Sequence, residues 1–261
     1  MKNSTLEASH VICPTDIAPD STTGSRERLL LAAERLFAAH GYSSVSVRDI
    51  ANAARANSAL VVYYFGGKEG LLSEVYRRHC APMNRERVRL LNESRSESEP
   101  LSLEKVLEAF IRPSLLRTQD RNSGVYFTRL RAVLSGENSA LLEKLVAENF
   151  DESTRIFVDA LCTALPKLTR DDVLWRFHFL LGAIYYTATG PTRIYTFSQG
   201  RCNPLDVEAT VPQMVAFAAA GFRGESVDHA RPARRSRRAD LPARVRAASK
   251  SATNPKVRGV A

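Results

Sequence analysis

The sequence feature that most constrains the fold is the stretch from residue 46 to residue 68, SVRDIANAARANSALVVYYFGGK. Ser46 and Asp49 have the spacing of a capping box at the start of a helix. The apolar residues that follow recur at i, i+3, i+4 and i+7, which gives that helix one buried face. Arg55 begins a tight turn, and Asn57 can cap a second short helix. This spacing predicts a helix-turn-helix, in which the second helix enters the major groove of DNA.

The segments on either side of this motif support the interpretation. The amphipathic segment RERLLLAAERLFAAHGYSS precedes it, and FGGKEGLLSEVY overlaps its end. Residues 25–80 therefore resemble the DNA-binding domain of the TetR family of bacterial repressors. The family pattern runs from "LF…HGY" through "VRDIA" and the recognition helix to an aromatic residue and "KEGLL", and all four pieces stand here in that order. The alternative is two short helices of an unrelated all-α bundle.

The resemblance implies a set of DNA contacts, and the side-chain types fit it. Short and apolar side chains on the second helix suit base edges and thymine methyl groups, with shape readout in addition. Arg48 lies where a base or a phosphate can be reached, and Lys68 matches the family's phosphate-contacting lysine. Backbone N–H groups beside Ser46 offer a further phosphate site. The predicted DNA-binding residues are Ser46, Arg48, Asn57, Ser58, Ala59, Leu60, Val62, Tyr63, Tyr64 and Lys68.

Two positions depart from the family pattern. Arg55 stands at the turn position that glycine usually holds, where a left-handed backbone costs a non-glycine residue about 1 kcal/mol or less. Val62 stands where the first tyrosine of the recognition helix is common, and Tyr63 and Tyr64 resemble the "NYHF" variant shifted by one residue. Which aromatic side chain meets which phosphate therefore stays open.

Composition places the chain among globular proteins without a cofactor signature. Its 261 residues are 44% hydrophobic, enough for a substantial core. No apolar run approaches the roughly 18 residues of a membrane span, and residues 1–24 lack the order of a signal peptide. The four cysteines lack metal-ligand spacing, so we expect reduced thiols, a cytoplasmic location, and neither metal nor cofactor.

The net charge of +9 is concentrated at one end of the chain. Residues 223–261 hold 11 Lys or Arg against 3 Asp or Glu, and they are rich in Ala, Pro and Ser. Such a segment cannot bury enough apolar surface to fold, so we expect it to be disordered. It is either a solvated tail or a non-specific phosphate contact. The prediction of DNA binding therefore depends on the motif and not on the net charge.

Hydrophobic periodicity predicts an all-α protein of about nine helices. The expected helices are 25–39, 47–54, 58–64, 68–91, 101–118, 123–134, 138–164, 171–189 and 205–220, with a loop from 190 to 204. Pro82 is expected to bend or divide its helix. We divide the chain into a disordered segment (1–24), a helix-turn-helix domain (25–80), a ligand-binding and dimerisation domain (81–222) and a disordered basic tail (223–261). A polar linker, 92–100, lies near the second boundary.

The expected helix at 171–189 is apolar almost all round, which requires burial on every side. Burial is available either in the protein's own core or at a subunit interface. In the TetR family the last two helices of each subunit form a four-helix bundle across a two-fold axis. The resemblance therefore implies a homodimer built on residues 171–189 and 205–221, with a monomer as the alternative.

Residues 148–183 resemble a TetR subgroup whose members respond to fatty acids or acyl thioesters. We therefore expect a small apolar or amphipathic effector, such as a fatty acid or an acyl-CoA. The predicted ligand-binding residues are Phe110, Phe127, Phe157, Trp175 and His178. Arg112, Arg129 and Arg131 are further candidates to pair with an acidic head group. For each of these residues a core or surface position is the alternative.

The sequence contains no glycine-rich phosphate loop, nucleophile elbow or HExxH motif, so we do not expect an enzyme. The predicted function is a dimeric repressor that binds a pseudo-palindromic operator, with two recognition helices about 34 Å apart, and that a ligand releases. An activator or ligand-blind regulator on the same fold, a non-specific nucleic-acid-binding helical protein, and an all-helical enzyme are the alternatives.

Overall fold

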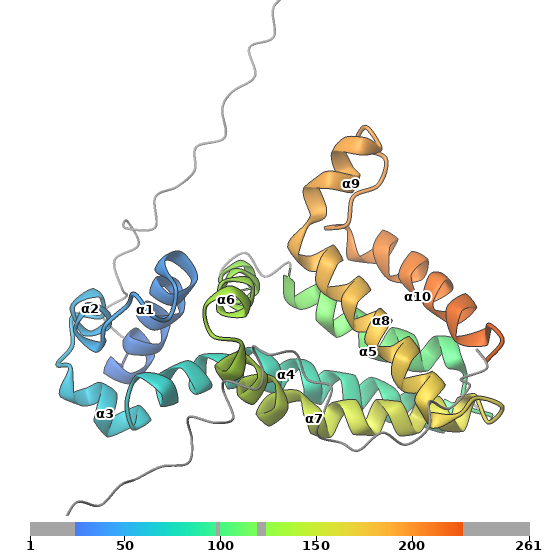
Figure 1. Ribbon diagram of the computed structural model, residues 1–261, viewed down its shortest axis with the longest axis horizontal. Helices are drawn as coiled ribbons and strands as arrows, with labels where there is room; N and C mark the ends of the chain where they lie inside the picture. The colour runs from blue at the N-terminus through green and yellow to red at the C-terminus, as the bar shows by residue number, and fades with distance from the viewer. Residues whose placement is uncertain (1–23, 98–99, 119–123, 227–261) are drawn as a thin grey trace, which may run out of the picture. The chain divides into compact units, whose positions relative to one another are not determined.

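The computed structural model describes residues 24–97, 100–118 and 124–226, and all regular structure within them is helical (Figure 1). The helices are α1 (Ser25–His40), α2 (Val47–Ala53), α3 (Ala59–Phe65), α4 (Lys68–Glu97), α5 (Leu103–Thr118), α6 (Gly124–Glu137), α7 (Ser139–Ala164), α8 (Arg170–Thr189), α9 (Pro191–Phe197) and α10 (Val207–Arg223). The all-α prediction is confirmed. Residues 1–23 and 227–261, where disordered ends were predicted, lie outside the described residues.

Two stretches expected to be irregular are helical. The loop expected after residue 189 contains α9, which Pro191 begins at a position where a missing N–H is harmless. The polar linker predicted from residue 92 is helical as far as Glu97. Ion pairs three and four residues apart, from Arg89 to Glu86 and Glu93, stabilise this last part of α4. Pro82 lies inside α4 and does not divide it.

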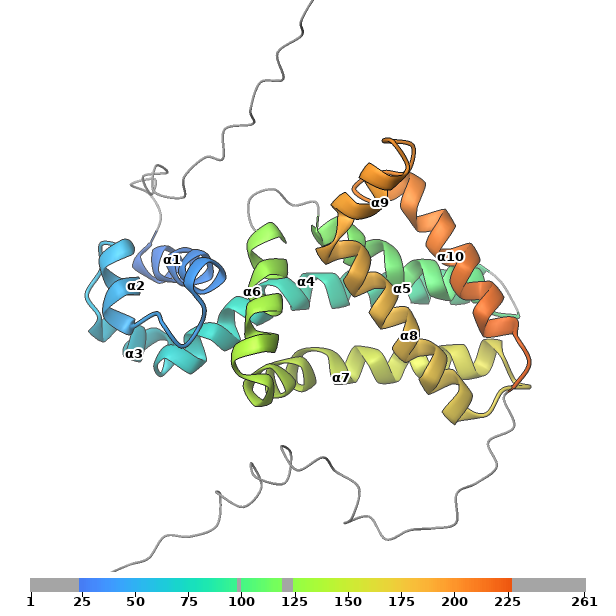
Figure 2. The same ribbon diagram turned by 45° about the horizontal axis from the view of Figure 1, so that its top comes forward.

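A first hydrophobic core lies among α1, α2, α3 and the first part of α4. Its largest fully buried side chains include Phe37 of α1 and Tyr76 of α4. Phe127, Leu130 and Leu134 of α6 and Leu145 of α7 belong to the same cluster. Helix α6 lies beside α1 in Figures 1 and 2 and contacts it. The N-terminal helices therefore do not complete their core alone; helices much later in the sequence contribute to it.

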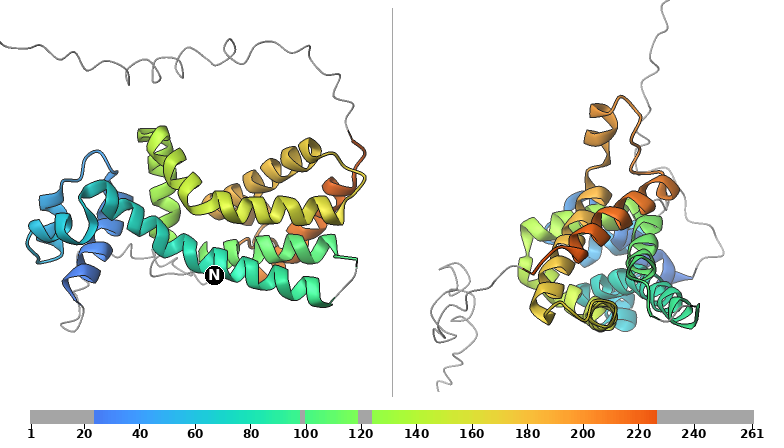
Figure 3. Two further views of the ribbon diagram at one scale, coloured as in Figure 1. Left: turned by 90° about the horizontal axis from the view of Figure 1, so that it is seen from below. Right: turned by 90° about the vertical axis from the view of Figure 1, so that its right-hand side faces the viewer.

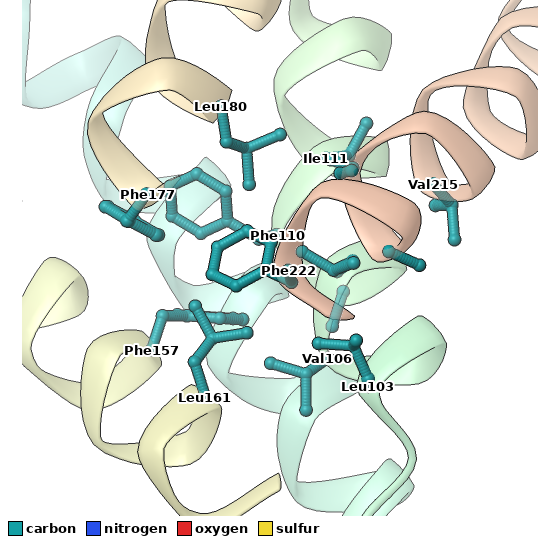
Figure 4. Close-up of a cluster of buried hydrophobic side chains, with 14 of the residues drawn as sticks. Leu103, Val106, Phe110, Ile111, Phe157, Leu161, Phe177, Leu180, Val215 and Phe222 are labelled. Carbon is teal, nitrogen blue, oxygen red and sulfur yellow. The ribbon is translucent and has the colours of Figure 1, made fainter. Parts of the chain in front are cut away.

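A second core lies among α5, α7, α8, α10 and the last part of α4. Figure 4 shows its centre, where the ring of Phe110 meets the rings of Phe157 and Phe177 with centroids 5.0 and 4.8 Å apart. Val215 and Phe222 of α10 pack on the same cluster, beside Ile111 of α5.

Helix α4 joins the two cores. Its residues Leu72 and Val75 belong to the first core and Leu91 belongs to the second. Figure 3 shows it running from α3 to the helices of the second core. Thirty helical residues span about 45 Å, so α4 is a continuous connection between them. No helix in the described ranges is both long and apolar enough to cross a membrane.

Candidate nucleic-acid interface and ligand cavity

The start of α2 has the capping geometry that the sequence predicts. Ser46 Oγ accepts a hydrogen bond from the backbone N–H of Asp49 at 3.2 Å, and Asp49 Oδ2 accepts one from the backbone N–H of Ser46 at 2.8 Å. The same carboxylate accepts a bond from the Ser46 hydroxyl, and these bonds hold the pKa of Asp49 below its usual range. The capping box is confirmed, and it fixes the direction in which α2 leaves the preceding loop.

The turn between α2 and α3 has a left-handed residue at the expected place. Arg55 has φ +48°, so the arginine adopts the conformation for which the family uses glycine. Asn57 Oδ1 accepts a hydrogen bond from the backbone N–H of Ala59 at 2.8 Å and so caps α3 from outside the helix. Arg28 of α1 donates to the carbonyl of Ala54 at 3.1 Å and ties the turn to α1.

Helix α3 has one buried and one exposed side. Val61 is fully buried in the first core, whereas the side chains of Val62 and Tyr63 are 63% and 78% exposed. Ala59 and Tyr64 are also exposed. Ser58 and Leu60, both among the predicted DNA-binding residues, are half-buried, and Leu60 packs against the first core. The exposed face of α3 therefore contains fewer side chains than the set of residues that the sequence predicts to contact DNA.

Two predicted DNA-contacting cations lie on the helices before and after α3. Arg48 is exposed near the start of α2. Lys68 is half-buried at the start of α4, with its Nζ 4.2 Å from the ring centroid of Tyr42. Burial lowers the pKa of Lys68, and the charges of Glu137 and Asp49 oppose that shift. Cations and tyrosine hydroxyls around an apolar face suit a partner that carries phosphates beside base edges.

A cavity of about 310 Å³ lies among α4, α5, α6, α7 and α8. Its lining combines apolar side chains with three arginines. The lining residues are Met83, Arg87, Phe110, Ser114, Arg117, Gly124, Phe127, Thr128, Arg131, Val146, Phe150, Asp151, Thr154, Leu181, Ile184, Tyr185 and Ala188. In the described part of the chain no group of three or more His, Cys, Asp or Glu side chains could hold a metal ion.

The predicted ligand-binding residues divide between this cavity and other places. Phe110 and Phe127 line the cavity. Phe157 lies outside it, fully buried in the second core, and Trp175 and His178 are exposed on α8. Phe157 of α7 is directed into the second core instead. On α8, Phe177 points inward, and an α-helix turns its near neighbours Trp175 and His178 to other sides.

The arginines predicted to pair with a head group also separate. Arg131 lines the cavity, whereas Arg129 is exposed and Arg112 forms ion pairs with Glu108 and Glu208. Arg87 and Arg117 line the cavity and the sequence analysis missed them. One signal could have identified Arg87, because it lies midway between Met83 and Leu91 at helical spacing, on an otherwise apolar stripe.

A buried histidine connects the cavity to α1. His79 of α4 lies with Nε2 2.8 Å from Glu34 Oε1, and both side chains are buried. Its Nδ1 lies 3.2 Å from Nη2 of the cavity residue Arg117. Because a guanidinium only donates, Nδ1 accepts and Nε2 carries the hydrogen that Glu34 receives. The ring of Phe127, a second cavity residue, stacks on the imidazole with centroids 4.4 Å apart.

Helix α6 makes a second connection to the helix-turn-helix. Glu137, at the end of α6, accepts hydrogen bonds from the backbone N–H groups of Tyr42 and Ser43 at 2.9 and 3.3 Å. These residues follow Gly41, which has φ +85°. The positive φ favours glycine at this position, and a Cβ there would lie 1.9 Å from Glu137 Oε1 and would displace that carboxylate.

Two family models match these parts of the chain. Residues 29–75 match the model described as bacterial regulatory proteins, tetR family, and residues 108–221 match the tetracyclin repressor-like C-terminal domain. The chain belongs to the TetR family. The first match includes the helix-turn-helix, and the second includes most residues that line the cavity.

Two curated repressors resemble parts of this TetR-family chain. The HTH-type transcriptional repressor AcnR of Corynebacterium glutamicum is 36% identical over 66 residues, 25% of this chain and 35% of AcnR. The HTH-type transcriptional repressor NicS of Pseudomonas putida is 26% identical over 160 residues, 57% of this chain and 73% of NicS. The chain thus spans about a third of AcnR and about three quarters of NicS.

Solved structures share the fold of this TetR-family chain. The fatty acid degradation regulator FadR from Bacillus halodurans matches 79% of this chain and all of its own, with a TM-score of 0.58 and 16% identity. A TetR-like transcriptional regulator from Rhodococcus matches 80% of this chain and all of its own, with a TM-score of 0.53 and 18% identity. At these identities the likeness shows the fold alone.

Proposed function

We propose that this protein is a sequence-specific transcriptional repressor that binds a pseudo-palindromic operator as a homodimer and is released by a small ligand. The observation that carries the proposal is the division of α3 between a core-facing Val61 and an outward face of Val62 and Tyr63. A helix anchored on one side and exposed on the other can enter a major groove. AcnR and NicS are both named repressors, which supports repression rather than activation.

The residues of the outward face differ in the DNA contacts that they suit. Ala59 and Val62 are short enough to approach base edges, and they favour the methyl groups of thymine. Arg48 is the candidate for a guanine contact, and Tyr63, Tyr64 and Lys68 are candidates for phosphate contacts. Asn57 caps the start of α3 and is exposed, and the half-buried Ser58 lies beside it, so both remain candidates for contacts at the start of the helix.

A two-fold dimer through α8 and α10 would cover apolar side chains that are exposed in the single chain. Trp175, Phe179 and Tyr186 of α8 are more than half exposed, and Phe217 of α10 is 73% exposed. Soluble monomers rarely expose so many large apolar side chains together. A second copy of the same surface is the partner that a two-fold axis supplies.

The cavity and its connections support release by a ligand. A small apolar or amphipathic molecule in the cavity would contact α4, α5 and α6 near His79 and Phe127. If its bound state favours a different position of α4 or α6, the spacing of the two recognition helices changes and operator affinity falls. By linkage, operator DNA must weaken ligand binding by the same factor.

Fluorescence anisotropy tests this function. The full chain is titrated onto a duplex from upstream of its own gene, near physiological salt and with excess competitor DNA. We expect tight, competitor-resistant binding that survives when the chain is ended at Glu225. A protein that coats nucleic acid through its basic tail would instead lose most of its DNA binding when the tail is removed. Binding that competitor DNA abolishes would contradict a sequence-specific repressor.

A further inference from the structure

The cavity contains a buried cation that only neutral groups contact. Arg87 is 4% exposed. Its Nε donates to the carbonyl of Phe110 at 3.1 Å, and Nη1 and Nη2 donate to Asn84 Oδ1 and Ser114 Oγ at 3.2 and 2.6 Å. The guanidinium carbon lies 3.8 Å from the ring centroid of Phe110. Every one of these acceptors is uncharged, so none of them neutralises the arginine.

A second cation shares the cavity from another helix. Arg131 of α6 lies over the rings of Phe150 and Tyr185, with 5.9 and 5.5 Å from the guanidinium carbon to the two ring centroids. Its buried Nε–H has no hydrogen-bond partner among the described residues. Burial lowers the pKa of Arg87 to about 9, and the charge of Arg131 adds to that shift. Arg87 therefore stays charged at neutral pH and repels the guanidinium of Arg131.

The surroundings supply little negative charge. No carboxylate oxygen in the described ranges lies within 4.0 Å of either guanidinium. Asp151 also lines the cavity, but its side chain is exposed to solvent. Burying a charge without a counter-ion costs several kcal/mol. A site that maintains two such charges in a hollow is preorganised for an anion.

We propose that the cavity binds a compact organic acid, with its carboxylate between Arg87 and Arg131 and its hydrocarbon body against Met83, Phe127 and Ile184. The inference rests on the proposed ligand-released repressor and specifies the chemistry of its ligand. A volume of about 310 Å³ is at the lower end of ligand sites. It suits an aromatic or medium-chain acid better than an acyl chain that carries a nucleotide.

The position of Arg131 connects this site to the helix-turn-helix. The next residue toward the N-terminus is Leu130, which is fully buried in the first core. A carboxylate that attracts Arg131 toward Arg87 therefore acts on a helix that packs against α1. The charge of the ligand, rather than its hydrocarbon body, is then the part that favours one position of α6.

Isothermal titration calorimetry on the full chain tests the proposal with matched pairs. The probes are phenylacetate, 3-phenylpropionate and octanoate, each beside its primary amide, which has nearly the same shape without the charge. We expect at least one acid to bind at least about tenfold more tightly than its amide, because charge-assisted hydrogen bonds are stronger than those to a neutral group. If no acid binds more tightly than its amide, the proposal is overturned.

Two variants place the anion. Arg131→Gln should weaken the acid about tenfold or more and leave the amide unchanged. Arg129→Gln, an exposed position on the same helix, should change neither. Equal acid affinity in Arg131→Gln and the parent protein would overturn the assignment. A thermal unfolding midpoint for each ligand-free variant verifies the fold, and Arg131→Gln should not lower it much, because the substitution relieves repulsion with Arg87.

The anisotropy assay separates this inference from the proposed function. If the protein binds its operator but none of the acids binds to it, the proposed repressor stands and the anion site is refuted. If an acid binds through Arg131 but does not weaken operator binding, the anion site stands and ligand-induced release from the operator is refuted.

Discussion

Helices α3 and α8 both expose apolar side chains, but their surroundings differ. The exposed face of α3 is short, ends in two tyrosines and is followed closely by Lys68 at the start of α4, and Arg48 is exposed on the preceding helix α2. The exposed side chains of α8 extend along a helix of 20 residues, and Phe217 of the neighbouring α10 adds to them. Exposure alone thus does not identify a partner. The charge beside the apolar surface does, and it favours DNA for α3 and a second copy of the chain for α8.

The largest effect is expected from a charge in the α8 surface. Phe179→Glu would place a carboxylate in an apolar interface, so we expect a monomer. Operator affinity should fall at least about 100-fold, because the second half-site contact then ceases to be intramolecular. Sedimentation velocity and anisotropy measure the two effects. Leu116→Glu, at an exposed apolar position on α5, is the control and should leave the dimer intact. A Phe179→Glu protein that is still a dimer would place the interface elsewhere.

A smaller loss of operator affinity is expected from a substitution on α3, and dimerisation through α8 should be unaffected. Tyr63→Ala should weaken operator binding about tenfold, the size of one charged hydrogen bond to phosphate, and leave the dimer unchanged. Competition anisotropy and sedimentation velocity are the measurements. Tyr195→Ala, an exposed tyrosine on α9, is the matched control. Equal losses in the two variants would argue that exposed tyrosines contribute only non-specifically.

The contact between α6 and the loop after α1 provides a test that is independent of both surfaces. Gly41→Ala would force a Cβ against Glu137 at a position with φ +85°, so we expect a loss of about 1–3 kcal/mol in the free energy of unfolding. Urea denaturation measures it. Gly136→Ala on α6, where a Cβ meets nothing within 4 Å, should be neutral or stabilising. A silent Gly41→Ala would mean that the loop and α6 are not held together.

The smallest effect is electrostatic and concerns the contact of α1 with α4. Hydrogen bonds and charges from Arg77 and Arg26 lower the pKa of Glu74 from 4.5 to about 2. Because the folded state binds the proton less readily than the unfolded state, this contribution is present above pH 4.5 and is lost as the pH falls toward 2. The pairs are partly exposed, so we expect less than about 1 kcal/mol.

The measurement for Glu74 is urea denaturation of the parent and Glu74→Gln between pH 6 and pH 2.5. The stability difference should shrink as the pH falls. Glu143→Gln, at an exposed position on α7, is the control. A Glu74→Gln difference that is constant over this range would show that the ion pairs do not contribute.

Local signals predicted the fold well, and contacts between distant helices limited the prediction of the site. The capping box at Ser46 and the left-handed Arg55 follow from spacing and turn chemistry, which involve only neighbouring residues. The half-buried position of Leu60 depends on how α3 packs against the first core. The cavity depends on five helices meeting, so Arg131 could be placed there only as one of several arginines, and Trp175 was placed there although it faces outward.

The packing of α6 determines where a hybrid regulator can be joined. A fusion made after residue 80, at the boundary that the sequence suggests, would separate the first core from Phe127, Leu130 and Leu134, which complete it. The transplanted helix-turn-helix would then meet the α6 of another protein, with side chains that were never fitted to it. A functional hybrid needs α6 to travel with the DNA-binding helices, even though more than forty residues of sequence lie between them.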